Sequence, residues 1–360
     1  MRAVEQIEFV LQDQRKIDMK LLPQVRKRSL GVGGVAILTA LALAACGSDS
    51  DSAATAATGS SPSQGDSAVA RVGYFGGTSL WTLAEDSNAV SDALKSIGGS
   101  VQWNGPFAPV EASEAAKAGR IDFTSNSVAT FFNEADSASP LVAFAAIRNS
   151  GDNQGIVVRN QAGIATVADL AGKRVAVSTP GSTGEYVLRA ALESASVPAT
   201  DVKTVYIANP ADGVSALASG DVDALATWDN FFASAQLIKD TTVLTTNAQT
   251  SARNWSLFVV TRSFLDAHPA SVKAVFDGLA NQAQQIRADR ELERKARLAD
   301  GQPANLVDLV VGFDPGEVVA INDEVLAQIK EVGEQTVRFG FRKSLPDLSK
   351  NYVDVTSLGG

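Results

Sequence analysis

The chain has 360 residues, 45% of them hydrophobic and 20% charged, with a formal net charge of -9 and a pI near 4.8. This length and hydrophobic content suffice for one large or two ordinary globular domains. The acidic balance excludes a nucleic-acid-binding protein, which would neutralise phosphates with basic surface, and a single Cys and a single His leave little material for thiol or metal chemistry.

The N-terminus has the pattern of a secretory signal. A basic cluster at 26–28 precedes an uncharged run at 29–45, and small residues lead up to Cys46. This order is typical of signal peptides. The stretch LALAAC resembles the lipobox of bacterial lipoproteins, which implies cleavage before a lipidated Cys46. A transmembrane anchor is the alternative, although a bilayer needs about 20 residues.

We therefore predict a signal peptide with a lipobox at 1–45, and the lipidated Cys with a disordered tether at 46–68. Residues 47–68 are rich in Ser, Ala, Thr, Gly and Asp and contain no large apolar side chain. Such a segment cannot bury enough surface to offset its ordering entropy. The stretch before residue 26 is long and mixed in charge, so Met19 is a second candidate for the translation start beside Met1.

Alternating strands and helices begin at Val69. Residues 69–75 (VARVGYF) have the pattern of a strand, a helix is predicted from Ser79 to Ser96, and a second strand follows at 100–103. This alternation favours an α/β fold with mainly parallel sheets.

An internal sequence repeat, which we call the echo, predicts two sheets with the same arrangement of helix and strand. Residues 109–122 (PVEASEAAKAGRID) and 210–223 (PADGVSALASGDVD) share a Pro near a helix start, a closing Gly and an Asp before an apolar strand. Hydrogen-bonding groups follow both strands, at 124–127 and at 227–230. Because open parallel sheets bind ligands at the carboxyl ends of their strands, we expect two lobes with a site between them.

A strand, a turn and a helix follow one another at 174–192 (RVAVSTPGSTGEYVLRAAL). Ser182 with Glu185 three residues later has the spacing of a capping box, so a helix is predicted to begin at Ser182. A helix start presents unpaired N–H groups and a positive dipole end, which suit an oxyanion such as sulfonate, phosphate, nitrate or carboxylate. Most capped helices bind nothing, so this motif is weak evidence alone.

The remaining elements are plainer. The pattern predicts a helix from Phe264, a solvated helix face in the heavily charged stretch 283–299, and a last long helix at 317–338. The final segment, from Ser344, is expected to extend over the surface. Further strands are predicted at 141–147, 155–158 and 255–260.

Three segments resemble, in order and spacing, the periplasmic solute-binding proteins of ABC importers for aliphatic sulfonates, taurine and nitrate. They are LAGKRVAVSTPGSTGEYVLRAAL, NPADGVSALASGDVDALATWDNF and RSFLDAHPASVKAVF, and the similarity extends over nearly the whole chain after the tether. The resemblance implies a type II binding-protein fold of two α/β lobes joined by two crossing strands. Lobe I would comprise 69–154 and 257–360, and lobe II 155–256.

Position by position, the resemblance implies a ligand contacted from both lobes. The anion would meet the backbone amides of Ser182 and Thr183, with hydroxyl help from Thr183 and Tyr186. The ring of Trp228 would line the organic tail, and Asp229 would meet an amino group or support the hinge. The implied contacts from lobe I are Thr78, Ser79, Ser125 and Asn126.

Several candidates have structural alternatives. Trp228 also suits core packing, and Asp229 also suits capping of the helix that follows it. Arg148, at the end of a predicted strand, either pairs with an anionic ligand or meets Asp152 at the surface. The Asn-Trp pair ending at Trp255 departs from the small-aromatic pair expected near the second crossing, so it is a further candidate for specificity.

The expected function is binding. The ligand, an aliphatic sulfonate or a taurine-like anion, would shift an open form toward a closed form that an ABC permease recognises. Nitrate, a pyrimidine or another small nitrogen compound is the alternative ligand. An enzyme on this fold is less favoured, because no serine has a histidine to activate it and no cluster has metal spacing. A surface lipoprotein for a protein partner is a third reading. We expect no cofactor, metal or nucleic acid, and an extracytoplasmic, lipid-anchored monomer.

Overall fold

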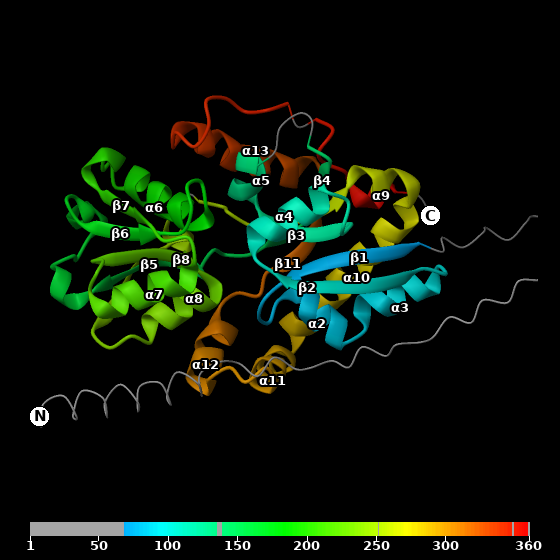
Figure 1. Cartoon of the computed structure of the whole chain (residues 1–360), viewed down its shortest axis with the longest axis horizontal. Helices are drawn as coiled ribbons and strands as arrows, with labels where there is room; N and C mark the ends of the chain where they lie inside the picture. Colours follow the sequence, from blue (N-terminus) through cyan, green and yellow to red (C-terminus); the bar gives the residue numbers. More distant parts are fainter. Residues whose placement is uncertain (1–67, 135–138, 251, 348, 359–360) are drawn as a thin grey trace, which may run out of the picture. The chain divides into compact units, whose positions relative to one another are not determined.

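The computed structural model describes residues 68–134, 139–250, 252–347 and 349–358, which form two α/β lobes, each built around one sheet (Figure 1). The predicted signal peptide, Cys46 and nearly all of the predicted tether lie outside these residues. Among the helices described, none has both the length and the apolar character needed to cross a membrane. The predicted α/β class with two lobes is confirmed.

Lobe I is built around a six-stranded sheet in the order β11-β4-β10-β3-β1-β2. β1 pairs in parallel with β2 and β3, whereas β10 runs antiparallel to β3 and β4. Apolar side chains on both faces bury the first six residues of β4, Leu141 to Ala146, while its last two residues are partly exposed. The strands are β1 (Val69–Phe75), β2 (Ser100–Phe107), β3 (Phe123–Ser127), β4 (Leu141–Arg148), β10 (Ser256–Thr261) and β11 (Glu317–Ala320).

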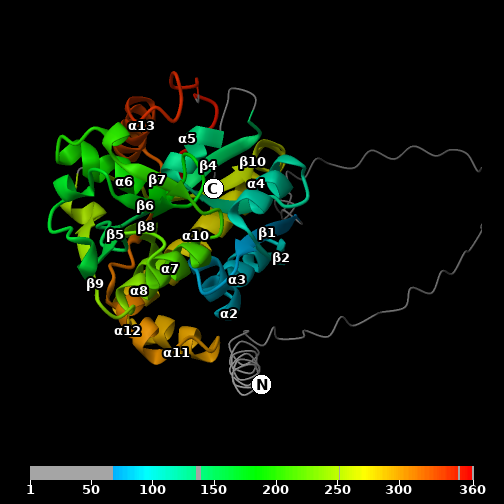
Figure 2. The same cartoon turned by 60° about the vertical axis from the view of Figure 1, so that its left-hand side comes forward.

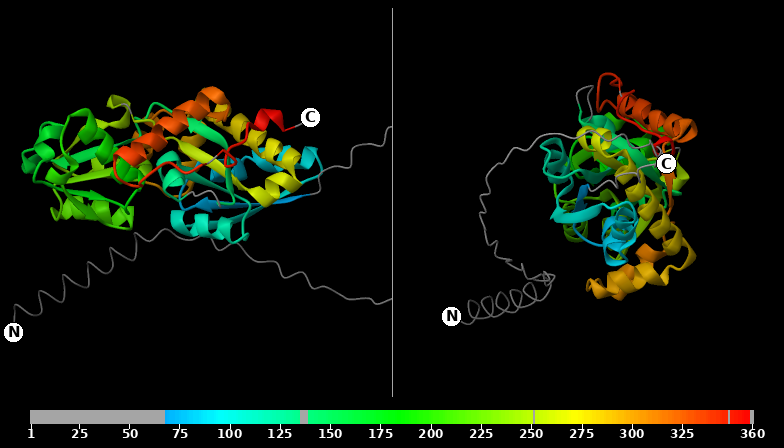
Figure 3. Two further views of the ribbon diagram at one scale, coloured as in Figure 1. Left: turned by 90° about the horizontal axis from the view of Figure 1, so that it is seen from above. Right: turned by 90° about the vertical axis from the view of Figure 1, so that its right-hand side faces the viewer.

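Helices cover both faces of this sheet. On one face, α2, α3 and α10 bury apolar side chains such as Trp81 and Leu279; on the other face, α4, α5 and α13 bury Phe132 and Ile329. Figure 3 shows the final segment, in red, leaving the end of α13; it pairs with β4 at Ala143 and reaches the α10 face of the sheet through Val355. These helices of lobe I are α2 (Leu80–Asp86), α3 (Ala89–Ser96), α4 (Pro109–Lys117), α5 (Val128–Glu134), α9 (Arg262–Ala267), α10 (Pro269–Ala288) and α13 (Asp323–Arg338). Two more helices, α11 (Glu291–Ala299) and α12 (Ala304–Gly312), follow α10 in the chain, and α12 packs against lobe II.

Lobe II is built around a five-stranded sheet in the order β7-β6-β8-β5-β9. β6 pairs in parallel with β7 and β8, and β5 runs antiparallel to β8 and β9. α6 packs on one face, and α7 and α8 pack on the other. The elements are β5 (Gln154–Arg159), β6 (Arg174–Val177), α6 (Thr183–Ser194), β7 (Lys203–Tyr206), α7 (Pro210–Ser219), β8 (Ala224–Trp228), α8 (Asp229–Gln236) and β9 (Thr241–Thr246).

The internal echo corresponds to one unit built twice. In lobe I, Arg71 near the start of β1 donates to Asp122 through Nε at 2.8 Å and Nη2 at 2.6 Å, and to the carbonyl oxygen of Gly119 at 2.8 Å. In lobe II, Arg174 at the start of β6 donates to Asp223 and to the carbonyl oxygen of Gly220 in the same way, with Nη2 distances of 2.9 and 3.0 Å. We call these the two Arg–Asp clamps. Each clamp joins a helix end to the neighbouring parallel strand.

Three elements differ from their prediction. The helix predicted at 79–96 is two helices, because Asn88 adopts the left-handed conformation (φ 62°) between α2 and α3. The helix predicted at 317–338 begins only at Asp323, since residues 317–320 pair with β4 as an edge strand. The charged stretch 283–299 is not wholly solvated, because Arg297 is only 7% exposed.

Candidate functional site

The strand ends that the echo singles out lie on the facing edges of the two lobes. β1 and β3 are parallel neighbours in lobe I, and β6 and β8 are parallel neighbours in lobe II, so each pair presents its carboxyl ends on one edge. The side-chain amide of Asn133, at the end of α5, donates to the carbonyl oxygen of Gly181 before α6 at 2.6 Å. The two lobes therefore meet beside the start of α6.

The start of α6 has the predicted Ser182 cap but not the predicted capping box. Ser182 is the N-cap, and its hydroxyl accepts from the amide of Glu185 at 3.4 Å. The Glu185 carboxylate does not return to the cap amide; it accepts from the amide of Gly181 at 2.8 Å and pairs with Arg189 at 2.9 Å. The first-turn amides, at Thr183 and the following glycine, have no acceptor inside the helix, whereas the amide of Ser182, which the sequence suggested for an anion, donates to the carbonyl oxygen of Thr179 at 3.1 Å.

Tyr186 lies on the buried side of α6. Its side chain is completely buried, its hydroxyl donates to the side-chain carbonyl of Gln335 on α13, and its ring packs against Phe339. Desolvation raises the pKa of the phenol, although a hydrogen bond with the backbone of Arg253 opposes this. In this structure Tyr186 joins α6 to lobe I.

Thr78 and Ser79 lie in the loop after β1 and are both engaged within the protein. The Thr78 hydroxyl donates to Asp300 at 2.6 Å and accepts from the side-chain amide of Gln302 at 3.0 Å. Ser79 is the N-cap of α2 and forms a capping box with Thr82. Their side chains thus hold this loop in place.

Ser125 and Asn126 are successive residues of β3 and point to opposite faces. Ser125 is half-buried, and Asn126 is 9% exposed and accepts from the amide of Ser127 through Oδ1 at 3.1 Å.

Trp228 ends β8 and Asp229 begins α8. Trp228 is half-buried and packs edge-on against Phe231, with ring centroids 5.9 Å apart. Asp229 has a positive φ of 46°. Its backbone N–H donates to the carbonyl oxygen of Asn153, in the first segment that connects the lobes, and its carboxylate accepts from the side-chain amide of Asn153 at 2.6 Å. Surrounding protein raises the pKa of the Asp229 carboxyl by desolvation, while water still reaches the side chain. The corner at Asp229 is therefore tied to the hinge.

Arg148 lies at the end of β4 and pairs with acids of its own lobe. Its guanidinium donates to Glu317 of β11, through Nε at 2.9 Å, and lies 3.8 Å from Glu324 of α13. The structural alternative for Arg148 thus has different partners from the Asp152 that the sequence suggested. Trp255 is 5% exposed, and its indole N–H donates to the carbonyl oxygen of Asn149 at 3.3 Å.

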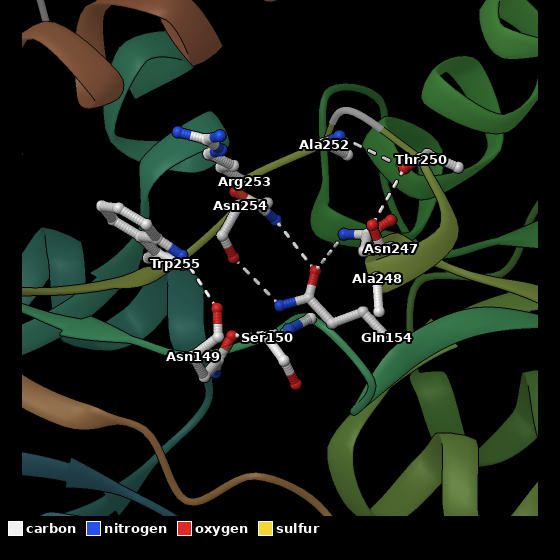
Figure 4. A pocket seen from close by; sticks show the side chains of 11 residues that line it. Asn149, Ser150, Gln154, Asn247, Ala248, Thr250, Ala252, Arg253, Asn254 and Trp255 are labelled. Atoms are coloured by element: carbon white, nitrogen blue, oxygen red, sulfur yellow. Dashed lines mark hydrogen bonds between the residues drawn. The ribbon is translucent and has the colours of Figure 1, made fainter.

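The two crossings, residues 149–153 and 247–255, are joined by buried amides (Figure 4). Gln154 donates to the carbonyl oxygen of Asn254 at 2.9 Å and accepts from the side-chain amide of Asn247 at 2.9 Å. Asn254 in turn accepts from the amide of Ala129 in the first turn of α5, also at 2.9 Å. These three amides each expose less than a tenth of their surface.

A cavity of about 230 Å³ lies beside these crossings. Of the predicted site residues only Trp255 lines it, so it is separate from the strand ends of β1, β3 and β8. Figure 4 shows its polar walls, which include Asn149, Ser150 and Thr250. We call it the hinge cavity.

The structure brings together the α6 start, the β8 corner and the loop after β1, but it adds partners that the sequence did not reveal. Asn153 and Gln154 hold the hinge, while Asn230 of α8 accepts from Arg297 of α11 at 3.0 Å. Asn and Gln carry no spacing signal of their own, and Arg297 lies within a charged run that predicted solvent exposure. Only the contacts across long sequence separations identify them.

Comparison with known proteins supports the fold. At the sequence level the chain is 28% identical, over 261 residues, to a protein of Escherichia coli (strain K12) that is named for binding aliphatic sulfonates; the match covers 71% of this chain and 80% of that protein. Among solved structures, it resembles the periplasmic aliphatic sulphonate binding protein SsuA of Escherichia coli, with a TM-score of 0.70, 24% identity, and 81% and 94% of the two chains covered.

Two further solved structures, a binding protein and an enzyme, are similar to this chain. The alkanesulfonate-binding protein SsuA of Xanthomonas axonopodis pv. citri, bound to MOPS, has a TM-score of 0.69 at 21% identity, covering 79% of this chain and 98% of its own. The desulfurization enzyme DSZB has a TM-score of 0.61 at 16% identity, covering 81% and 98%. Binding proteins and an enzyme thus share the periplasmic binding-protein fold described here.

The family is shown by a match over more than half of the sequence. The model described as NMT1/THI5 like matches residues 96–291, which run from the end of α3 to the start of α11 and include all of lobe II. The earlier resemblance to periplasmic solute-binding proteins is confirmed by the fold and by these matches. This chain belongs to the NMT1/THI5-like family.

Proposed function

We propose that this protein is the extracytoplasmic solute-binding component of an ABC importer, and that it captures a small organic anion, an aliphatic sulfonate or a taurine-like compound, between its two lobes. The observation that carries the proposal is the start of α6, a Ser-capped helix of twelve residues that follows a parallel strand at the edge facing lobe I. The names of the sulfonate-binding relatives support the same class of ligand.

The charges around this site favour a ligand that carries more than an anion. Glu185 already occupies the amide of Gly181, and its charge is balanced by Arg189. Asp229, at the facing corner, forms no salt bridge among the described residues; its carboxylate accepts from Asn153, and Arg297 acts on it only through its charge. An amino group beside the sulfonate, as in taurine, would complement this acid, whereas the ring of Trp228 suits a short aliphatic tail.

The residues proposed for the site are those expected from the sequence, with roles refined by their places in the fold. The amide at Thr183 would bind the anion, because the amide of Ser182 already donates to the carbonyl oxygen of Thr179, and Trp228 and Asp229 would bind the rest of the ligand. Thr78, Ser79 and Tyr186 would act mainly by holding loops and lobes in place. Ser125, Asn126 and Trp255 would contribute indirectly, and Arg148, which pairs with Glu317 of its own lobe, would not contact the ligand.

The envelope context is also a proposal. We propose that Cys46 is lipidated after cleavage of residues 1–45, that residues 46–68 tether the monomer to the membrane, and that the closed form docks on the permease. The lobe boundaries proposed are 69–154 with 257–360, and 155–256. Metabolic labelling with a fatty acid checks the anchor, because a Cys46→Ser variant should lose the label.

A thermal-shift panel tests the ligand class. Alkanesulfonates, taurine, nitrate, sulfate, pyrimidines and amino acids would each be added to the purified protein, and a ligand at a hundred times its Kd should stabilise it by about 2.7 kcal/mol. We expect sulfonates to raise the midpoint, taurine most, and Trp228→Ala to remove the effect. A shift caused only by nitrate or by neutral nitrogen compounds would transfer the proposal to that alternative ligand class.

A further inference from the structure

A continuous chain of side-chain hydrogen bonds connects the loop after β1 in lobe I to the β8 corner in lobe II. Asn230 of α8 accepts from Arg297 Nη1 at 3.0 Å, and the same nitrogen lies 3.5 Å from the side-chain oxygen of Gln302. Gln302 donates to Thr78 at 3.0 Å, and Thr78 donates to Asp300 at 2.6 Å. We call this chain the α11 relay.

The relay passes through a buried ion pair. Arg297 and Glu293 lie one turn apart on α11, their side chains are 8% and 9% exposed, and they are 2.7 Å apart. Arg290 also pairs with Glu293 at 2.7 Å. A guanidinium held from several sides has a single geometry, so Arg297 can carry a positional constraint from one end of the relay to the other.

The segment that holds the relay, α11 and α12, is docked on lobe II by apolar contacts. α12 packs against α8, as Figure 2 shows, and the ring of Phe313 stacks on Phe232 of the lobe II core at 6.0 Å. On the lobe I side, the side chains that join this segment to the loop after β1 are polar, namely Asp300 and Gln302 to Thr78. The polar joint is the one that can separate in water at low cost, because its groups can be hydrated.

The opposite rim of the lobe interface is different in kind. There, Tyr186 and Ala190 of α6 share one apolar core with Phe132 and Ile329 of lobe I. Separating that rim exposes buried apolar surface, whereas separating the joint at Thr78 exchanges hydrogen bonds for water. The lobe interface therefore has an apolar side, at α6, where the lobes stay in contact, and a polar side, at Thr78, where they can separate.

We propose that Asp300 and Gln302 are positioning residues for ligand capture: they latch the α11–α12 segment onto the loop after β1, so that the two lobes open on this side and close when the Thr78 joint forms. This inference rests on the proposed function for its ligand, but not for the motion itself. The latch acts without touching the ligand, because it holds Thr78 directly and holds Asn230, the residue next to Asp229, through Arg297.

The test compares Asp300→Ala with Asp308→Ala in the full chain. Both acids are exposed; Asp300 precedes α12, whereas Asp308 lies within it and pairs only inside the segment, with Arg294. Removing a charge-assisted hydrogen bond should raise the taurine or alkanesulfonate dissociation rate about tenfold in Asp300→Ala and less than twofold in Asp308→Ala. Small-angle scattering of the ligand-free protein should show a larger radius of gyration for Asp300→Ala than for Asp308→Ala.

Gln302→Leu provides a second variant that leaves every charge in place, and it should act in the same direction. Equal scattering and equal dissociation rates for Asp300→Ala, Gln302→Leu and Asp308→Ala would overturn the latch. If no compound in the panel binds any variant, the proposed ligand fails, while the scattering difference still decides the latch. A lower melting temperature with unchanged scattering would show that Asp300 only stabilises the loop, which also overturns it.

Discussion

The packing of α6 on β8 leads to a sharp prediction for Gly184. A methyl group added at Gly184 would lie 2.5 Å from the carbonyl oxygen of Ala226, a backbone atom that cannot swing away. An unstrained contact needs about 3.5 Å, so the start of α6 must move from β8 by roughly 1 Å. Overpacking of this kind costs about 1–3 kcal/mol, and the better helix propensity of Ala returns at most about 1 kcal/mol.

We therefore expect Gly184→Ala to lower the free energy of unfolding by about 1–2 kcal/mol. The shift of the first-turn amides should also weaken the binding of taurine or ethanesulfonate by tenfold or more, because hydrogen bonds lose strength steeply with geometry. Urea unfolding gives the stability, and isothermal titration gives the affinity. Both are measured on the purified protein.

Gly312→Ala is the matched control. Gly312 also lies in a helix, but a methyl group there meets no atom within 4 Å. It should leave stability unchanged or raise it by up to about 1 kcal/mol. If Gly184→Ala were as stable as this control, the close packing of α6 on β8 would be refuted. If it lost stability yet bound sulfonates normally, the α6 amides would not belong to the site.

Three other variants probe separate parts of the fold. Gln154→Leu leaves the buried amides at both crossings without their hydrogen-bond partner and should lower the free energy of unfolding in urea by about 2–3 kcal/mol. A loss of stability no larger than that of a Gln→Leu change at an exposed position would contradict the hinge network. Arg148→Met removes a pair that is more than one-third exposed and should cost under about 1 kcal/mol with sulfonate affinity unchanged, whereas a large affinity loss would place Arg148 at the ligand. The hydrogen bond from Arg174 lowers the pKa of Asp223, so that carboxylate stabilises the fold above the unfolded pKa of about 3.9 and loses its effect as the pH falls through the lower folded value. Asp223→Asn should accordingly flatten the acid side of the stability curve, and an unchanged curve would argue against the lobe II clamp.

Much of the fold was predictable because local patterns and tertiary contacts agree. The first strand, VARVGYF, has the predicted bounds, and its alternation matches the buried Ala70 and Val72 beside the exposed Val69 and the half-buried Arg71. The echo was informative because a Pro start, a Gly end and an Asp partner each have a local physical role. The two-lobed arrangement follows from such repeated units.

The misses arise where distant contacts outweigh local preference. The break at Asn88 is marked by Asp86, Ser87 and Asn88, residue types that favour helix ends and turns, but the apolar periodicity continues across it and hides the φ of 62° at Asn88. Residues 317–320 contain two Val and pair with β4, which decides strand over helix. Arg297 lies in a run that is otherwise charged and solvated, and its burial depends on Glu293 and on a residue of lobe II. The candidate site was thus predictable at its α6 start, but not in the amides and the relay that hold it.

The two Arg–Asp clamps also suggest where a reporter could be attached. They lie near the amino ends of β1 and β6, at the end of each strand away from the facing edges, and the exposed residues Ala118 and Ser219 stand at equivalent places beside them. The only natural cysteine is Cys46. Cysteines introduced at these two positions of a chain with Cys46→Ser would accept a pair of fluorescent dyes on firmly held supports. The protein would then become an optical sensor whose signal follows the distance between its lobes.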